Sequence, residues 1–207
     1  MNKVPFRILA VAAAVALSAN ASAESSFQTG AGALTATARI DFRITIPKIL
    51  FLRVGTGTLF ANNAGVDLID FTPAATSLGM GSVAATAASG DRTNGAVTAQ
   101  LVSNAGSVNL NAATTAGTLT DGAGNSIPYT KINVASIALA PAILPGAALW
   151  TFPGWDTPTV YTPAANSSTN VAAQWTFSYA NDTVPRAGTY GGVNVNGGRV
   201  AFVASVL

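Results

Sequence analysis

The chain has 207 residues, no cysteine and no histidine, and only 9% of its residues are charged. Without cysteine it has no disulfide, thiolate metal site or lipid-modified cysteine, and without histidine it lacks the usual general base and zinc ligand. Lys and Arg together number ten and Asp and Glu eight, so the chain lacks the basic footprint that binds nucleic acid.

The first 23 residues have the three parts of a secretory signal peptide. Lys3 and Arg7 supply the positive start, residues 8–17 form an apolar run, and Ala21 and Ala23 are small residues where a signal peptidase reads. The apolar run is about half of the roughly 20 residues that a membrane-spanning helix needs. We therefore expect cleavage after Ala23, which removes two basic residues and leaves a nearly neutral mature chain that favours association.

Residues 24–33 are small and polar and contain glycine, which predicts a flexible N-terminal arm. Residues 34–46 then alternate strictly between apolar and polar side chains, which is typical of a strand with one buried face. We expect this segment to be the first strand of the domain. Pro47 ends it because proline cannot donate to a central ladder, and residues 49–54 predict a second, more fully buried strand.

The middle of the chain predicts several shorter strands. They are expected at 66–71, 96–102, 107–110, 117–119, 127–132 and 133–139. Residues 121–125 indicate a turn by their composition. Asp121 and Asn125 carry oxygen ligands, but their spacing does not match a calcium loop, so we prefer a polar turn there.

Residues 141–163 combine five prolines with several aromatic side chains, which predicts an irregular or edge segment. Three of the aromatic side chains form a candidate ligand patch for a sugar or a protein: Trp150, Trp155 and Tyr161. Burial as part of the core is the alternative interpretation of the same residues.

Regular alternation returns near the C-terminus. Residues 173–179 predict a strand with its aromatic side chains on one face, and residues 190–195 and 199–207 predict two strands joined by a turn at 196–198. The last strand places four apolar residues on one side, namely Val200, Phe202, Ala204 and Val206.

These short strands, separated by Gly, Asn and Pro turns, predict an all-β protein, a sandwich or a barrel, and we expect one sandwich domain over residues 34–207. An enzyme is not expected, because Lys48 and Lys131 lack the context of a serine–lysine pair and no two carboxylates are paired by the sequence. The candidate carboxylates all lie in turn-like sequence: Asp67, Asp70, Asp156 and Asp182. No metal or cofactor is expected.

The two ends of the chain resemble chaperone–usher fimbrial subunits. The glycine-bearing arm and the alternating strand after it resemble the N-terminal extension of such pilins, and residues 181–192 (NDTVPRAGTYGG) are similar to the P-x-x-G-T-Y run before their last strand. The resemblance implies an incomplete immunoglobulin-like antiparallel β-sandwich whose groove is filled by the arm of another subunit. It also implies a periplasmic chaperone and an outer-membrane usher as partners, and a route through the periplasm to the cell surface.

The resemblance assigns two groups of residues to assembly. Phe27, Gly30, Ala31 and Ala33 would belong to the donor arm, and Val200, Phe202, Ala204 and Val206 would line the acceptor side. The function expected is therefore a structural, self-associating subunit of a fimbria or surface fibre, whose polymerisation is lost when Glu24–Ala33 is deleted. The alternative is a secreted carbohydrate- or protein-binding sandwich that uses the aromatic patch and loses glycan retention on Trp155→Ala.

Overall fold

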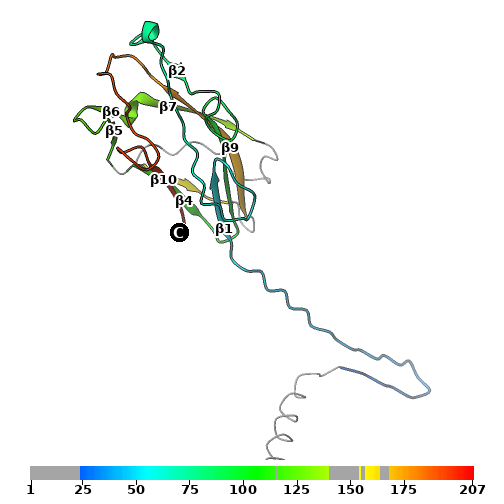
Figure 1. The fold of residues 1–207 in the computed structure, drawn as a ribbon. Coiled ribbons are helices and arrows are strands. Elements are labelled where there is room, and N and C mark those ends of the chain that lie inside the picture. The colour runs from blue at the N-terminus through cyan, green and yellow to red at the C-terminus, as the bar shows by residue number, and fades with distance from the viewer. Residues whose placement is uncertain (1–23, 115, 140–153, 155–156, 164–167) are drawn as a thin grey trace, which may run out of the picture. The chain divides into compact units, whose positions relative to one another are not determined.

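The computed structural model describes residues 24–114, 116–139, 154, 157–163 and 168–207 (Figure 1). The chain divides into two compact units, Met1–Ile46 and Pro47–Leu207. The signal peptide expected at residues 1–23 lies outside the described residues. Within the part of the chain that the structure describes, no helix is long and apolar enough to cross a membrane.

The second unit is built from β-strands and two short 3-10 turns, which confirms the all-β prediction. The strands are β1 (Leu50–Val54), β2 (Val83–Ala84), β3 (Ala96–Ser103), β4 (Val108–Thr114), β5 (Thr118–Thr120), β6 (Ser126–Pro128), β7 (Ile132–Ala138), β8 (Thr159–Tyr161), β9 (Thr169–Tyr179) and β10 (Val200–Val206). The 3-10 turns are η1 (Ala75–Ser77) and η2 (Tyr129–Lys131).

The strands form two larger sheets and one small hairpin, and all their pairings are antiparallel. In the first sheet β9 lies between β3 and β7, β1 pairs with the other side of β3, and β2 pairs with the end of β9. In the second sheet β4 lies between β10 and β8, and β5 pairs with β6 separately. Among the described strands, β1 and β10 are therefore edge strands of their sheets.

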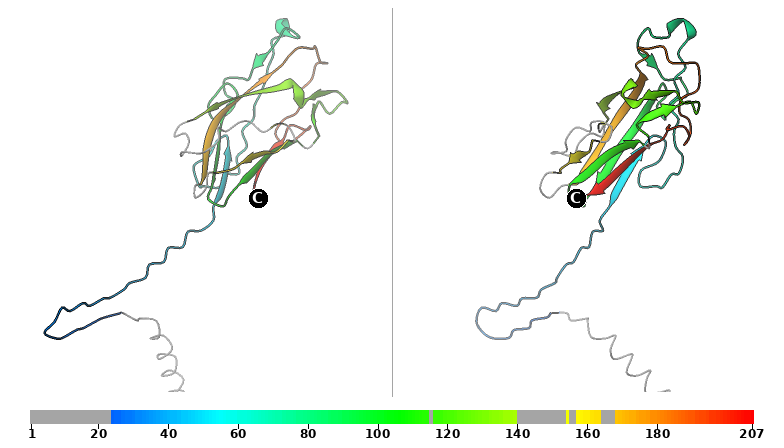
Figure 2. Two further views of the ribbon diagram at one scale, coloured as in Figure 1. Left: turned by 180° about the vertical axis from the view of Figure 1, so that it is seen from behind. Right: turned by 90° about the vertical axis from the view of Figure 1, so that its left-hand side faces the viewer.

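One hydrophobic core lies between the two larger sheets (Figure 2). Along β9 every second residue is buried, because its alternation points one face inward. Trp175 is fully buried and is paired in register with Val97 of β3. The opposite wall comes from Val108 and Leu110 of β4, which are also fully buried. The arrangement is sandwich-like, with inward-facing residues from both layers sharing one core.

The segment expected as the first strand does not join this core. Residues 34–46 are assigned to no strand, every one of them is exposed, and they lie outside the compact unit that begins at Pro47. The prediction of a buried face there is thus wrong for the single chain. Alternation specifies an amphipathic strand, but a face is buried only when a neighbouring strand covers it.

Other differences from the sequence-based expectations follow from backbone geometry and position. Residues 49–54 do form β1, but it is half-buried rather than fully buried, because it lies at a sheet edge. Residues 190–195 form no strand, and the expected hairpin at 196–198 is absent from the described structure. Asn194 and Asn196 both have positive φ, as do two glycines before them, and such residues interrupt a pleated ladder.

Candidate functional site

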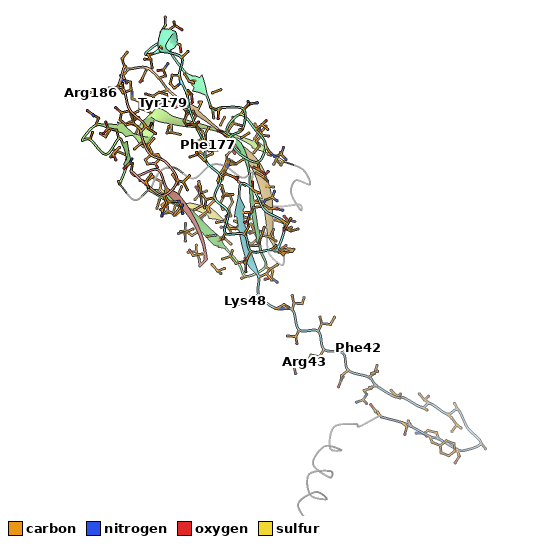
Figure 3. All side chains as sticks on the ribbon, viewed as in Figure 1. Phe42, Arg43, Lys48, Phe177, Tyr179 and Arg186 are labelled. Carbon is orange, nitrogen blue, oxygen red and sulfur yellow. The ribbon has the colours of Figure 1, made fainter. Side chains whose placement is uncertain are left out.

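The first part of the candidate site is the apolar face of residues 34–46. Phe42 is 86% exposed, and the large side chains that share its face are exposed as well: Leu34, Ile40, Ile44 and Ile46. Phe42 and Arg43 lie on extended backbone, whose successive side chains point to opposite sides (Figure 3). The segment is therefore an amphipathic strand without a sheet, and we call residues 34–46 the donor segment.

The residues that the resemblance assigned to the donor arm lie before this segment. They are all exposed, and Phe27 is the only large apolar side chain among them: Phe27, Gly30, Ala31 and Ala33. The structure therefore gives no reason to prefer residues 24–33 as the donor. The alternation that marks residues 34–46 was visible in the sequence, but it was assigned to the domain itself.

The second part of the site is the inner face of β10. The four residues expected there do share one face toward the core, since they pair in register with Thr114, Ala112, Leu110 and Val108 of β4. The three apolar β4 residues are fully buried, whereas the β10 residues are only partly covered. Val206 is 38% exposed, although the residue directly opposite it, Val108, has no exposed surface.

The same incomplete cover occurs on β1, the edge strand of the other sheet. Leu50, Leu52 and Val54 face inward, because their register partners on β3 point into the core. Leu52 and Val54 are half-buried and Leu50 is exposed, while all three of their partners on β3 are fully buried. The core is thus only partly covered at the side of the sandwich where β1 and β10 form the two sheet edges.

The described strand β10 carries none of the sequence features that usually protect an edge strand from pairing with another strand. Natural edge strands carry charged residues, proline or a bulge to prevent such pairing. Residues 200–207 (VAFVASVL) contain no charged residue and no proline, and β10 pairs with β4 without interruption. Outward-facing Val203 is also exposed.

An aromatic contact anchors β10 across the core. The rings of Phe202 and Trp175 have centroids 5.3 Å apart and planes inclined by 37°. Phe202 is partly buried at this contact and packs against the core cluster.

The candidate ligand patch is not supported as a unit. Tyr161 lies on β8, is only 3% exposed and belongs to the core cluster, so its assignment to a surface patch is wrong. It pairs with Val108, and its place in the ladder turns its side chain inward. Trp150 and Trp155 lie outside the described residues.

Two of the candidate carboxylates, those of Asp67 and Asp182, form local hydrogen bonds. Asp67 accepts hydrogen bonds from the backbone N–H and the hydroxyl of Thr56, at 2.7 and 2.8 Å, and so closes a loop after β1. The Asp182 carboxylate accepts a hydrogen bond from Lys131 at 2.7 Å, which lowers the pKa of Asp182. The described residues contain no group of three or more acidic, His or Cys side chains that could hold a metal ion.

The Asp121 carboxylate organises its own turn, as the sequence indicated. It accepts hydrogen bonds from the backbone N–H groups of Ala123 and Asn125 and from the Asn125 side-chain amide. These bonds, that from the Asn125 side chain first, lower the pKa of Asp121. The arrangement is an Asx-type turn that connects β5 with β6.

Comparison with known proteins adds no assignment. No protein-family model, no curated protein and no solved structure matches this chain.

Proposed function

We propose that this chain is an exported structural subunit that assembles into a fimbria or surface fibre by strand addition. The donor segment of one copy would complete the sandwich of the next copy at the edges of β1 and β10. One observation carries the proposal: the chain holds an amphipathic strand without a sheet, and a sheet edge where the core is only partly covered. Strand addition joins such complementary parts through main-chain hydrogen bonds and alternate side-chain pockets.

The lengths and patterns of the two parts match. β10 spans seven residues and directs four side chains inward. Residues 40–46 are a run of the same length with four large apolar side chains at alternate positions: Ile40, Phe42, Ile44 and Ile46. Paired along β10, this run would bury all four side chains and leave Asp41, Arg43 and Thr45 in solvent. A register slip by one residue would bury the charges, so the pattern specifies the face.

The edges must separate to admit a strand between them. β1 and β10 approach within 8 Å between Cα atoms, but they exchange no ladder hydrogen bonds. A strand hydrogen-bonded to both would require a separation of about 9.5 Å, twice the usual spacing between strands. We therefore expect β1 and β10 to move apart by a few ångströms on assembly, with the inner faces of both becoming buried.

The proposal also includes the type of sandwich and the route by which the subunit reaches the cell surface. The acceptor would be an incomplete immunoglobulin-like sandwich that a periplasmic chaperone covers at β10 until an outer-membrane usher brings a second subunit. A mature chain with little net charge favours such association. A carbohydrate site on the aromatic patch is disfavoured, because Tyr161 is part of the core.

The test compares two substitutions that add the same charge on opposite faces of the donor segment. Phe42→Asp places a carboxylate on the apolar face and should abolish assembly, because burying an unpaired charge is strongly unfavourable. Thr45→Asp places it on the polar face and should leave assembly nearly unchanged. Mature chain from the bacterial periplasm would be analysed by size-exclusion chromatography, negative-stain microscopy and unheated SDS gels, in which strand-inserted fibres give a ladder.

A peptide covering residues 34–46 gives the complementary measurement. Added to the Phe42→Asp chain, it should raise the melting temperature and slow hydrogen exchange at β1 and β10, and the same peptide with Phe42→Asp should not. The proposal fails if Phe42→Asp chains form fibres as the natural chain does, or if the peptide protects no amide at these edges.

A further inference from the structure

The donor segment is covalently attached to β1, one of the two edge strands between which it would insert. We call the position between β1 and β10, which must open on insertion, the gap. Only residues 47–49 separate the donor segment from β1. If the chain reversed there, residues 40–46 would pair with β1 of their own molecule and close the gap from within. A short tether gives such an intramolecular strand an effective concentration in the millimolar range, far above that of a second copy in solution. Assembly by strand addition therefore requires that this reversal be unfavourable.

The pairing pattern restricts which reversals could work. The inward residues of β1 are Leu50, Leu52 and Val54. A two-residue turn at 47–48 would place Thr45, Arg43 and Asp41 opposite them and so direct the polar face into the core. A three-residue loop at 47–49 places Ile46, Ile44 and Phe42 there instead, and one at 46–48 places Ile44, Phe42 and Ile40 there. Three residues is thus the shortest loop with the correct face, and longer ones give up apolar pairs.

The loop at 46–48 would place Pro47 at the second central position of a type I turn, where proline is disfavoured. The loop at 47–49 is blocked by the residue at its last position. Such a hairpin is built from a type I turn followed by a residue in the left-handed region, usually glycine. Pro47 suits the first position of the turn, but Ile49 would occupy the left-handed position. A β-branched side chain is among the least tolerated there, because its Cβ substituents clash with the backbone.

A second residue, Asn104, holds the backbone of residues 47–49 in the extended conformation. The Asn104 side-chain amide donates from Nδ2 to the carbonyl oxygen of Pro47 at 2.8 Å, and its Oδ1 accepts from the N–H of Ile49, also at 2.8 Å. Asn104 follows β3 directly, so its amide continues the ladder beyond the pair of Leu50 and Ser103. Residues 33–49 accordingly contain no turn or bend.

We propose that Ile49 and Asn104 act together to exclude the chain's own donor segment and reserve the gap for the donor of a second copy. Ile49 makes the three-residue loop at 47–49 unfavourable, and Asn104 stabilises the extended alternative through two hydrogen bonds. This inference rests on the proposed function, and it identifies the second copy rather than the same chain as the partner of the gap.

The test is the double variant Ile49→Gly with Asn104→Ala in the full mature chain. It should fold back on itself, remain monomeric and lose fibre formation by at least about tenfold, with β10 amides protected at all protein concentrations. The matched control carries Pro47→Gly and Asn104→Ala, which favours a two-residue type II′ turn at 47–48. The control should not protect β10, because its turn presents the polar face, although it contains the same new glycine and lacks the same amide.

Two further variants keep the outcome interpretable. Ile49→Asn alone should give an intermediate effect, because asparagine tolerates the left-handed region. Adding Phe42→Asp to the double variant should remove its β10 protection. If the double variant forms fibres like the natural chain and gains no β10 protection, the exclusion role is overturned while the proposed function stands. If the natural chain never assembles but the double variant gains protection that Phe42→Asp removes, the proposed function fails and the exclusion role stands.

Discussion

Strand β9 and the donor segment have the same kind of sequence and opposite surroundings. Both alternate with a period of two, and both place aromatic or branched apolar residues on one face. In β9 that face is buried against the second sheet, whereas in the donor segment every side chain on it is exposed. The difference is the presence of neighbours: β9 has strands on both sides and a layer above it. Alternation therefore specifies which face a segment can bury, and neighbouring strands decide whether that face is buried.

The largest expected difference in the free energy of unfolding is between alanine substitutions at Trp175 and at Phe42. Trp175→Ala removes a fully buried ring from β9 and should destabilise the unassembled chain by about 3–5 kcal/mol, enough to unfold much of it. Phe42→Ala should change the unfolding free energy of the same chain by less than about 0.5 kcal/mol, because Phe42 contacts solvent. Urea unfolding at concentrations too low for assembly measures both. A large effect of Phe42→Ala there would mean that the donor segment already packs within its own chain.

A smaller contrast is expected between Val108 and Val206, which are the same residue type at directly paired positions. Val108→Ala should cost about 2–3 kcal/mol, since two buried methyl groups are lost and a cavity remains. Val206→Ala should cost less than about 1 kcal/mol in the unassembled chain, because Val206 is partly exposed.

The same two valine substitutions can also be used to measure whether the donor segment covers the edge. When the donor peptide of residues 34–46 is bound, the cost of Val206→Ala should rise toward that of Val108→Ala, because the edge has become part of the core. Thermal unfolding with and without peptide gives both values. Equal costs for the two variants before peptide is added would show that the edge is already covered.

The smallest effect concerns the exposed ion pair of Lys131 and Asp182. The hydrogen bond from Lys131 holds the pKa of Asp182 below its ordinary value of 3.8 in the folded chain. The pair's contribution to stability is therefore complete above that unfolded value and disappears as the pH falls through the lower folded pKa. Asp182→Asn should flatten part of the loss of melting temperature between about pH 5 and pH 2. An unchanged pH profile would show that the pair contributes nothing to stability.

Several elements were predictable because their sequences specify them locally. β3 and β10 were expected close to their observed positions, since their alternation continues over many residues, and β1 and β7 were also expected. β9 was expected only over residues 173–179, and the structure extends it back to Thr169. Residues 66–71 were expected as a strand and form none, although Ile69 and Phe71 do pack against the core. Their contribution is side-chain burial from an irregular segment, which alternation does not distinguish from a strand.

Contacts between distant residues account for the features that the sequence did not reveal. Asn181 is fully buried with positive φ, and its side chain accepts from the N–H of Gly79 and donates to the carbonyl oxygens of Ser77 and Gly81. Asn104 likewise matters only because residues 47 and 49 lie beside it. A polar residue after a strand gives no indication of such a partner, since the partner is set by strand order.

The sequence by itself determined the all-β class, the amphipathic character of residues 34–46 and the face that each alternating segment would present. Those properties follow from the pleated backbone, in which successive side chains point to opposite sides. Tertiary structure decided which faces are covered, which strands are edges, and that the inward faces of β1 and β10 remain half-exposed. Burial requires a neighbour, and neighbours are fixed by register and strand order across the whole chain rather than by the local pattern.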